Sequence, residues 1–155
     1  MEKKKRFIFL TDKFYEDYPH DKYSEIEQKP TRPYIQVVVE IEGVQFAVPL
    51  RSDINHPHVL WTDKPNHCGV DFSKAVVITD AEKYIDYQKD PYIRPSEFDA
   101  LRGKDYKIKE KMIRYIADYK DAKNNLSDPI KQKLYEYSTL QYFEKYIYKA
   151  DKRDD

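Results

Sequence analysis

Glycine and cysteine are scarce in this sequence, and net charge is absent. Three glycines among 155 residues leave neither a G-x-G-x-x-G nor a G-x-x-x-x-G-K motif. The dinucleotide-binding and P-loop classes of protein are therefore excluded. The one cysteine, Cys68, excludes a disulfide framework and suits a reducing compartment.

Positive and negative side chains balance, because Lys plus Arg and Asp plus Glu both number 28. A nonspecific duplex-DNA binder needs an excess of cations, so this balance argues against that class. A local basic pocket is still compatible with this balanced composition, since the placement of charge matters more than its sum. The basic run at residues 3–6 is interpreted either as a nucleic-acid arm or as a solvated leader before the first strand.

Long apolar runs are missing as well. The stretch at residues 7–10 is too short for the apolar region of a signal peptide, and nothing approaches the roughly 20 apolar residues of a membrane span. We therefore expect a cytoplasmic protein without a membrane partner. With 155 residues, 40% of them apolar, the chain fits one domain.

The first half of the chain predicts strands. Residues 34–50 alternate between apolar and polar side chains on either side of Glu42-Gly43, which is typical of a hairpin with a tight turn. Pro49 cannot donate to a ladder, which predicts a sheet edge or barrel rim at that end. Shorter strands are expected at residues 6–10, 59–61 and 75–79, and a helix at 11–18. Several short strands of mixed burial favour a small barrel over a flat sheet.

The second half predicts two helices. Apolar side chains repeat at helical spacing over residues 105–123, and a second helix begins near Pro129, which suits an early helical position. Its expected buried stripe consists of Ile130, Leu134, Tyr137, Leu140 and Ile147. The prediction is thus an α+β fold with a β-rich half (1–80), a helical half (81–150) and a frayed tail (151–155).

Polar residues at the two ends of the predicted hairpin form one candidate site. Thr31, Arg32 and Tyr34 precede its first strand, and Arg51 and Ser52 end its second strand. Because these ends lie side by side in an antiparallel pair, the two guanidinium groups and the hydroxyls converge into a phosphate-sized recess. The alternative is that the rim arginines pair with carboxylates, the candidates being Asp53, Asp71 and Glu42.

Histidines and a lysine supply further candidates. His56 and His58, with His67 and Cys68 nearby, are interpreted as acid–base or phosphate-contacting groups, as surface-loop residues or as a loose metal set. Lys74 either reaches the same rim from a strand entrance or is a solvated edge lysine. The 15 tyrosines exceed what the helical stripes absorb, so we expect some at the surface or at interfaces. The alternatives for them are stacking on unpaired bases and a role in helix packing or a protein–protein interface.

Two segments resemble the core motifs of a known family. Residues 32–41 and 47–52 are similar to the paired motifs of type III toxin–antitoxin toxins, the ToxN/AbiQ family. Residues 69–78 resemble its CptN- or TenpN-like branch. The resemblance covers residues 30–80 and is weak in the helical half. A lysine that relatives carry just after the second motif is replaced here by Asp53-Ile54.

The resemblance implies a compact SH3-like (MazF/Kid-like) antiparallel β-barrel elaborated by C-terminal helices. It also implies a metal-independent endoribonuclease without a cofactor, active in phage defence by abortive infection. Such a toxin is silenced by a pseudoknot-like antitoxin RNA in a closed protein–RNA assembly. The expected catalytic residues are Arg51, Ser52, His56 and Lys74, and the expected RNA-binding residues are Thr31, Arg32, Tyr34 and His58. The alternatives are a noncatalytic RNA-binding module and a protein-interaction adaptor.

Overall fold

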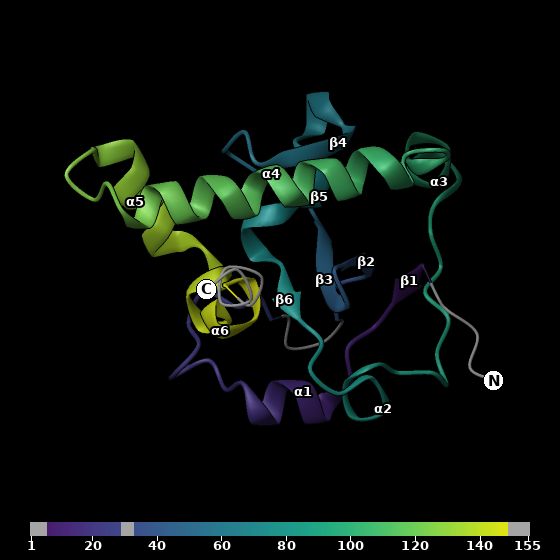
Figure 1. The fold of residues 1–155 in the computed structure, drawn as a ribbon. Helices are drawn as coiled ribbons and strands as arrows, with labels where there is room; N and C mark the ends of the chain where they lie inside the picture. The colour runs from purple at the N-terminus through teal and green to yellow at the C-terminus, as the bar shows by residue number, and fades with distance from the viewer. Residues whose placement is uncertain (1–5, 29–32, 149–155) are drawn as a thin grey trace.

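The protein has an α+β fold built on a six-stranded antiparallel sheet. The computed structural model describes residues 6–28 and 33–148 (Figure 1). The strands run in the order β1-β2-β3-β5-β4, and β6 also pairs with β3. Their bounds are β1 Phe7–Ile8, β2 Gln36–Ile41, β3 Val44–Arg51, β4 Val59–Asp63, β5 Cys68–Asp71 and β6 Val76–Val77. The edge strands β1 and β4 do not pair in the described chain, so the sheet is open and the predicted barrel is not confirmed.

The predicted hairpin is confirmed. Val37 in β2 lies opposite Val48 in β3, and the two-residue turn between the strands is Glu42-Gly43. Both turn residues have positive φ, 49° and 80°, as a two-residue turn that matches strand twist requires. Tyr34 and Arg51 are therefore brought to the same open end of the hairpin.

The sheet position predicted for Pro49 is wrong, because β3 is the central strand. It pairs with β2 on one side, and on the other with β6 through Phe46 and Ala47 and with β5 through Leu50 and Arg51. The N–H of Leu50 donates to Ile35 on the β2 side, so the missing N–H of Pro49 faces the other side. Pro49 is tolerated there because it lies where the neighbouring strand changes from β6 to β5.

The first predicted C-terminal helix is confirmed, and the second is confirmed at its start at Pro129 but not in its length. Helix α4 spans Asp105–Lys123, whereas α5 spans only Pro129–Tyr137 and is followed by the 3-10 turn η3 Thr139–Tyr142 and by α6 Glu144–Ile147. The break falls at buried Ser138, whose hydroxyl accepts the N–H of Leu140 and the phenol of Tyr115. Ile130 and Tyr137 are consequently 79% and 60% exposed, and do not belong to a buried stripe.

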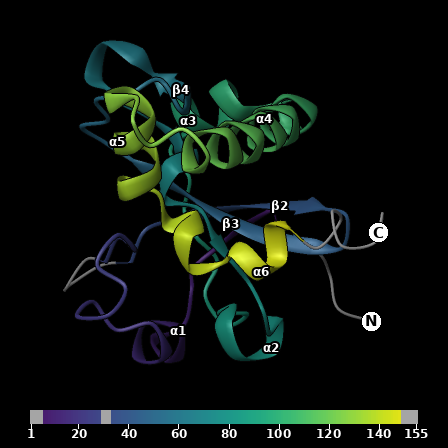
Figure 2. The same ribbon diagram turned by 60° about the vertical axis from the view of Figure 1, so that its left-hand side comes forward.

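The remaining helices frame the sheet. Helix α4 packs on β2 and crosses the upper part of the view in Figure 1, while α1 Asp12–Asp17 and α2 Ala81–Tyr84 contact each other at the bottom. The helix expected at residues 11–18 is α1, and the Thr11 side chain caps its start. Figure 2 shows the β2–β3 hairpin extending beneath α4. Helices α2 and α3 (Pro95–Leu101) carry too few apolar repeats to be predicted from the pattern.

Some predictions fall outside residues 6–28 and 33–148. They concern Thr31 and Arg32 of the rim, the first three residues of the basic run, and the tail 151–155. Within the described chain, no helix has the length and apolar character needed to cross a membrane.

Candidate functional site

Strand β5 is the element that assembles the candidate site. It lies between β3 and β4, with Arg51 opposite Gly69 and Val59 opposite Asp71. Gly69 permits this close packing, because a Cβ atom there would lie 2.4 Å from the carbonyl oxygen of Leu60. No strand is predicted at residues 68–71, and β5 is therefore an element that the sequence pattern misses.

Asp71, at the end of β5, is the centre of the site. Its side chain is fully buried and accepts hydrogen bonds on both oxygens. Oδ1 accepts the Ser73 hydroxyl at 2.6 Å and the Ser73 N–H at 3.0 Å, and Oδ2 accepts Arg51 at 2.5 Å. Burial opposes the charged form, but hydrogen bonds from His56 and Ser73 and the charge of Arg51 outweigh it and lower the pKa of Asp71.

Arg51 is held by two carboxylates, as one of the sequence alternatives predicts. Its guanidinium lies 2.5 Å from Asp71 and 2.9 Å from Glu27. Burial opposes the charge, but these two carboxylates raise the pKa of Arg51 above its ordinary value. The pairing with Asp71 agrees with the alternative interpretation of the rim, and Glu27 is an additional partner that the sequence did not indicate.

His56 is also engaged at both ring nitrogens. Nδ1 accepts the backbone N–H of His58 at 3.1 Å, so it carries no proton. Nε2 lies 3.1 Å from Asp71 Oδ1 and 3.2 Å from the Ser73 hydroxyl. This geometry fits the neutral imidazole with its proton on Nε2, donated to Asp71. His56 thus has no free nitrogen with which to accept a proton.

His58 differs from His56 in having unengaged ring nitrogens. Its ring lies 5.6 Å from that of His56 and 5.3 Å from that of Tyr115 on α4, and neither nitrogen forms a hydrogen bond within the described residues. Burial, followed by the neighbouring His56, lowers the pKa of His58, while Asp118 and Asp71 partly offset this effect. The lowered pKa of His58 favours a neutral imidazole near pH 7, with a nitrogen available to accept a proton.

A cavity of about 520 Å³ opens at the same end of the hairpin. Tyr34, Arg51 and Ser52 line it together with Arg94 and Glu97 around the start of α3. The convergence of the two hairpin ends is confirmed for these three predicted residues. Neither His56 nor His58 lines the cavity, so Arg51 is the residue that the cavity and the Asp71 cluster share.

Lys74 does not lie where the sequence interpretation placed it. It ends the 3-10 turn η2 Phe72–Lys74, and its ammonium donates to Glu25 and to the carbonyl of Tyr137, both at 2.9 Å. The side chain is only 12% exposed, so it is no solvated edge lysine. Lys74 joins the end of α5 to the loop after α1. Because both of its partners are distant in the sequence, the sequence alone misplaces this side chain.

The histidine and cysteine residues do not form a shared cluster. His67 Nδ1 lies 2.9 Å from the Ile54 carbonyl, and the Cys68 thiol donates to the Asn66 carbonyl. Burial raises the pKa of the Cys68 thiol, which makes it a poor nucleophile. Among the described residues, no group of three or more His, Cys, Asp or Glu side chains is placed to hold a metal ion.

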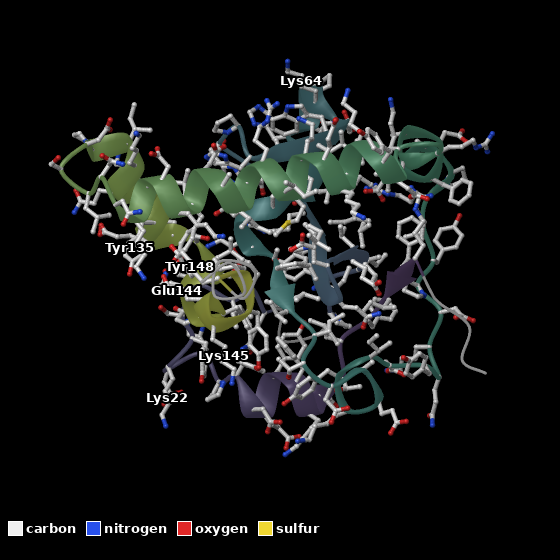
Figure 3. All side chains as sticks on the ribbon, in the orientation of Figure 1. Lys22, Lys64, Tyr135, Glu144, Lys145 and Tyr148 are labelled. Atoms are coloured by element: carbon white, nitrogen blue, oxygen red, sulfur yellow. The ribbon has the colours of Figure 1, made fainter. Side chains whose placement is uncertain are left out.

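The tyrosines divide between packing and exposure. Tyr119 stacks on Tyr135 and donates to Glu144 at 2.5 Å, and Figure 3 shows Tyr135, Glu144 and Tyr148 gathered beside the end of α4. In contrast, Tyr92 and Tyr106 are each 75% exposed. The expectation that some tyrosines lie at the surface is confirmed.

Three members of the site, Asp71, Ser73 and Glu27, are not predicted as functional residues, and Asp71 is expected only as a partner of a rim arginine. Ser73 follows Asp71 in an Asp-x-Ser arrangement, in which the carboxylate caps the next turn, and this local pattern is the signal that was overlooked. Glu27 lies in a loop and offers no such signal.

Comparison with known proteins adds no identification, because no protein-family model, curated protein or solved structure matches the chain.

Proposed function

We propose that the protein is a metal-independent endoribonuclease toxin of the type III toxin–antitoxin class. The observation that carries this proposal is the unengaged, neutral imidazole of His58 beside the Asp71 cluster. RNA cleavage of this kind needs only a proton acceptor for the 2′-hydroxyl, because that hydroxyl is the nucleophile. The motif resemblance over residues 30–80 supports the same assignment.

We assign proton transfer to His58 instead of His56 or Lys74, because the side chains of His56 and Lys74 are already engaged. His58 takes the 2′-hydroxyl proton, the 2′-oxygen attacks phosphorus, and the imidazolium returns a proton to the departing 5′-oxygen. The products are a 2′,3′-cyclic phosphate and a 5′-hydroxyl. His56 acts as a positioning residue, because its bond to Asp71 and to the His58 backbone fixes the loop that carries His58.

The cavity at the hairpin end is the proposed site for a nucleotide adjoining the scissile bond. Tyr34 offers a ring on which a base can stack, and Ser52 offers a hydroxyl to a phosphate oxygen. Arg51 lies between this cavity and Asp71, and its two carboxylates hold it in place. It therefore fixes the geometry of the rim more than it neutralises phosphate.

Cleavage of a single-stranded RNA by the purified protein tests the proposal. We expect products with 2′,3′-cyclic phosphate ends, unchanged activity in excess EDTA, and a loss of about 10²–10⁴-fold on His58→Gln. His20→Gln is the matched control, since His20 is an exposed loop histidine, and it should retain full activity. Loss of cleavage on chelation, or retention of cleavage by His58→Gln, would contradict the mechanism.

The same preparation separates the alternatives. A noncatalytic RNA-binding module would bind RNA and leave it intact, and an adaptor would carry no nucleic acid, which absorbance at 260 nm detects. The proposed antitoxin partner predicts a short tandem repeat followed by a terminator immediately upstream of the reading frame. We expect transcripts of that repeat to bind the protein in a closed assembly and to inhibit cleavage.

A further inference from the structure

The cations that line the cavity at the hairpin end are already paired within the described residues. Arg51 contacts Asp71 and Glu27, and Arg94 contacts Glu97 at 3.2 Å. Lys74 is engaged with Glu25. Among the described residues, the unpaired cations available to an RNA strand at His58 therefore lie outside this group.

Helix α4 carries cations without partners. Lys107, Lys111 and Arg114 follow one another at spacings of four and three residues, which places them on one flank of the helix. None of the three forms an ion pair within the described chain, and Lys107 and Arg114 are exposed. At about 1.5 Å per residue, the row is roughly 10 Å long.

This flank leads to His58. Asp118, four residues beyond Arg114, acts electrostatically on His58, and Tyr115 lies against the His58 ring. The row of Lys107, Lys111 and Arg114 is thus continuous with the helix surface that holds the proposed base. The row is exposed at Lys107 and Arg114 and half-exposed at Lys111, forms no ion pair within the described residues, and runs along the helix toward Asp118 and His58.

We propose that Lys107, Lys111 and Arg114 bind the phosphate backbone of a single-stranded RNA segment and guide it to His58. The inference rests on the proposed function for its choice of ligand. A single row of three cations matches one strand, whereas a duplex presents two phosphate rows and is better served by a protein with excess positive charge. Because the net charge of the chain is zero, binding of an RNA strand depends on a local concentration of cations, which this row supplies.

Binding of a noncleavable strand tests the row without requiring catalysis. The probe is a short single-stranded 2′-O-methyl oligoribonucleotide, with affinity measured by fluorescence anisotropy at several salt concentrations. For the triple variant Lys107→Gln, Lys111→Gln, Arg114→Gln, we expect at least a tenfold weaker affinity at low salt. The slope of log affinity against log salt should fall by about 2, since each single-strand phosphate contact contributes about 0.7.

A matched triple variant controls for the change in total charge. Lys22→Gln, Lys89→Gln and Lys133→Gln remove three exposed lysines that form no ion pair in the described chain, and Figure 3 places Lys22 far below α4. This control should keep the wild-type slope. Equal losses in the two triples, or no binding of the strand by the wild type, would overturn the proposal, as would stronger binding of an acidic peptide.

Two further measurements distinguish a failure of the binding row from a failure of the endoribonuclease proposal. Arg114→Lys alone should retain the wild-type slope, because charge and not guanidinium shape is required. If the wild type binds the strand through the row but cleaves no RNA, the binding surface stands and the endoribonuclease proposal fails. If it cleaves RNA with a salt slope that the row variant leaves unchanged, only the binding row is wrong.

Discussion

Replacing the buried carboxylate of Asp71 should strongly destabilise the fold. Asp71→Asn keeps the size of the side chain, but its amide N–H₂ must face groups that already donate, from Arg51, His56 or Ser73. Removing one partner of a buried ion pair costs about 3–5 kcal/mol. We expect about 3 kcal/mol, because Arg51 keeps Glu27 at 2.9 Å. Total stability of a domain is only about 5–15 kcal/mol, so this loss is large.

Urea unfolding followed by the fluorescence of Trp61, the single tryptophan, measures this effect. With a denaturant slope of about 1–3 kcal/mol/M, the midpoint should fall by about 1–3 M. Asp99→Asn is the control, because it removes the exposed Arg102–Asp99 pair and should leave the midpoint unchanged. A midpoint for Asp71→Asn equal to that of the wild type would refute the view that Asp71 organises the site.

The pH dependence of this difference follows from the direction of the Asp71 shift. Its pKa is lowered in the folded state, so the carboxylate stabilises the fold above the unfolded pKa of about 3.9. That stabilisation is lost as the pH falls through the folded pKa. The gap between wild type and Asp71→Asn should therefore be constant near neutrality and shrink below about pH 4.

Two other predictions concern the proposed base and the packing of β5. Because burial lowers the pKa of His58, the cleavage rate should rise through a midpoint below about 6.5 and be level near pH 7; a midpoint well above 7 would contradict His58 as the base. Gly69→Ala should lower the urea midpoint, since its Cβ would meet the Leu60 carbonyl at 2.4 Å, with a cost of about 1–3 kcal/mol. Gly43→Ala is its comparison, because Gly43 has no atom within 4 Å of an added Cβ and only its positive φ resists the change. An unchanged midpoint for Gly69→Ala would show that β4 and β5 can separate without loss.

Local patterns predicted the elements whose determinants are close in sequence. The hairpin at residues 34–50 follows from alternation and from a turn that demands positive φ, and α4 follows from helical spacing. The end of α5 was missed because Ser138 breaks the helix through contacts with Tyr115, 23 residues away. The role of Pro49 was misjudged because a proline near a strand end reveals only that one N–H is missing, not which strands flank it.

Local sequence patterns indicate an α+β chain without excess charge, a hairpin that brings Tyr34, Arg51 and Ser52 to one end, and two histidines in one loop. Which side chains are already engaged in ion pairs and hydrogen bonds depends on the three-dimensional packing. Asp71 and Glu27 engage Arg51, Asp71 engages His56, and Glu25 engages Lys74, because β5 and the loop after α1 bring these carboxylates in from distant positions. What this leaves unengaged, His58 and the row on α4, depends on long-range packing that no local pattern encodes.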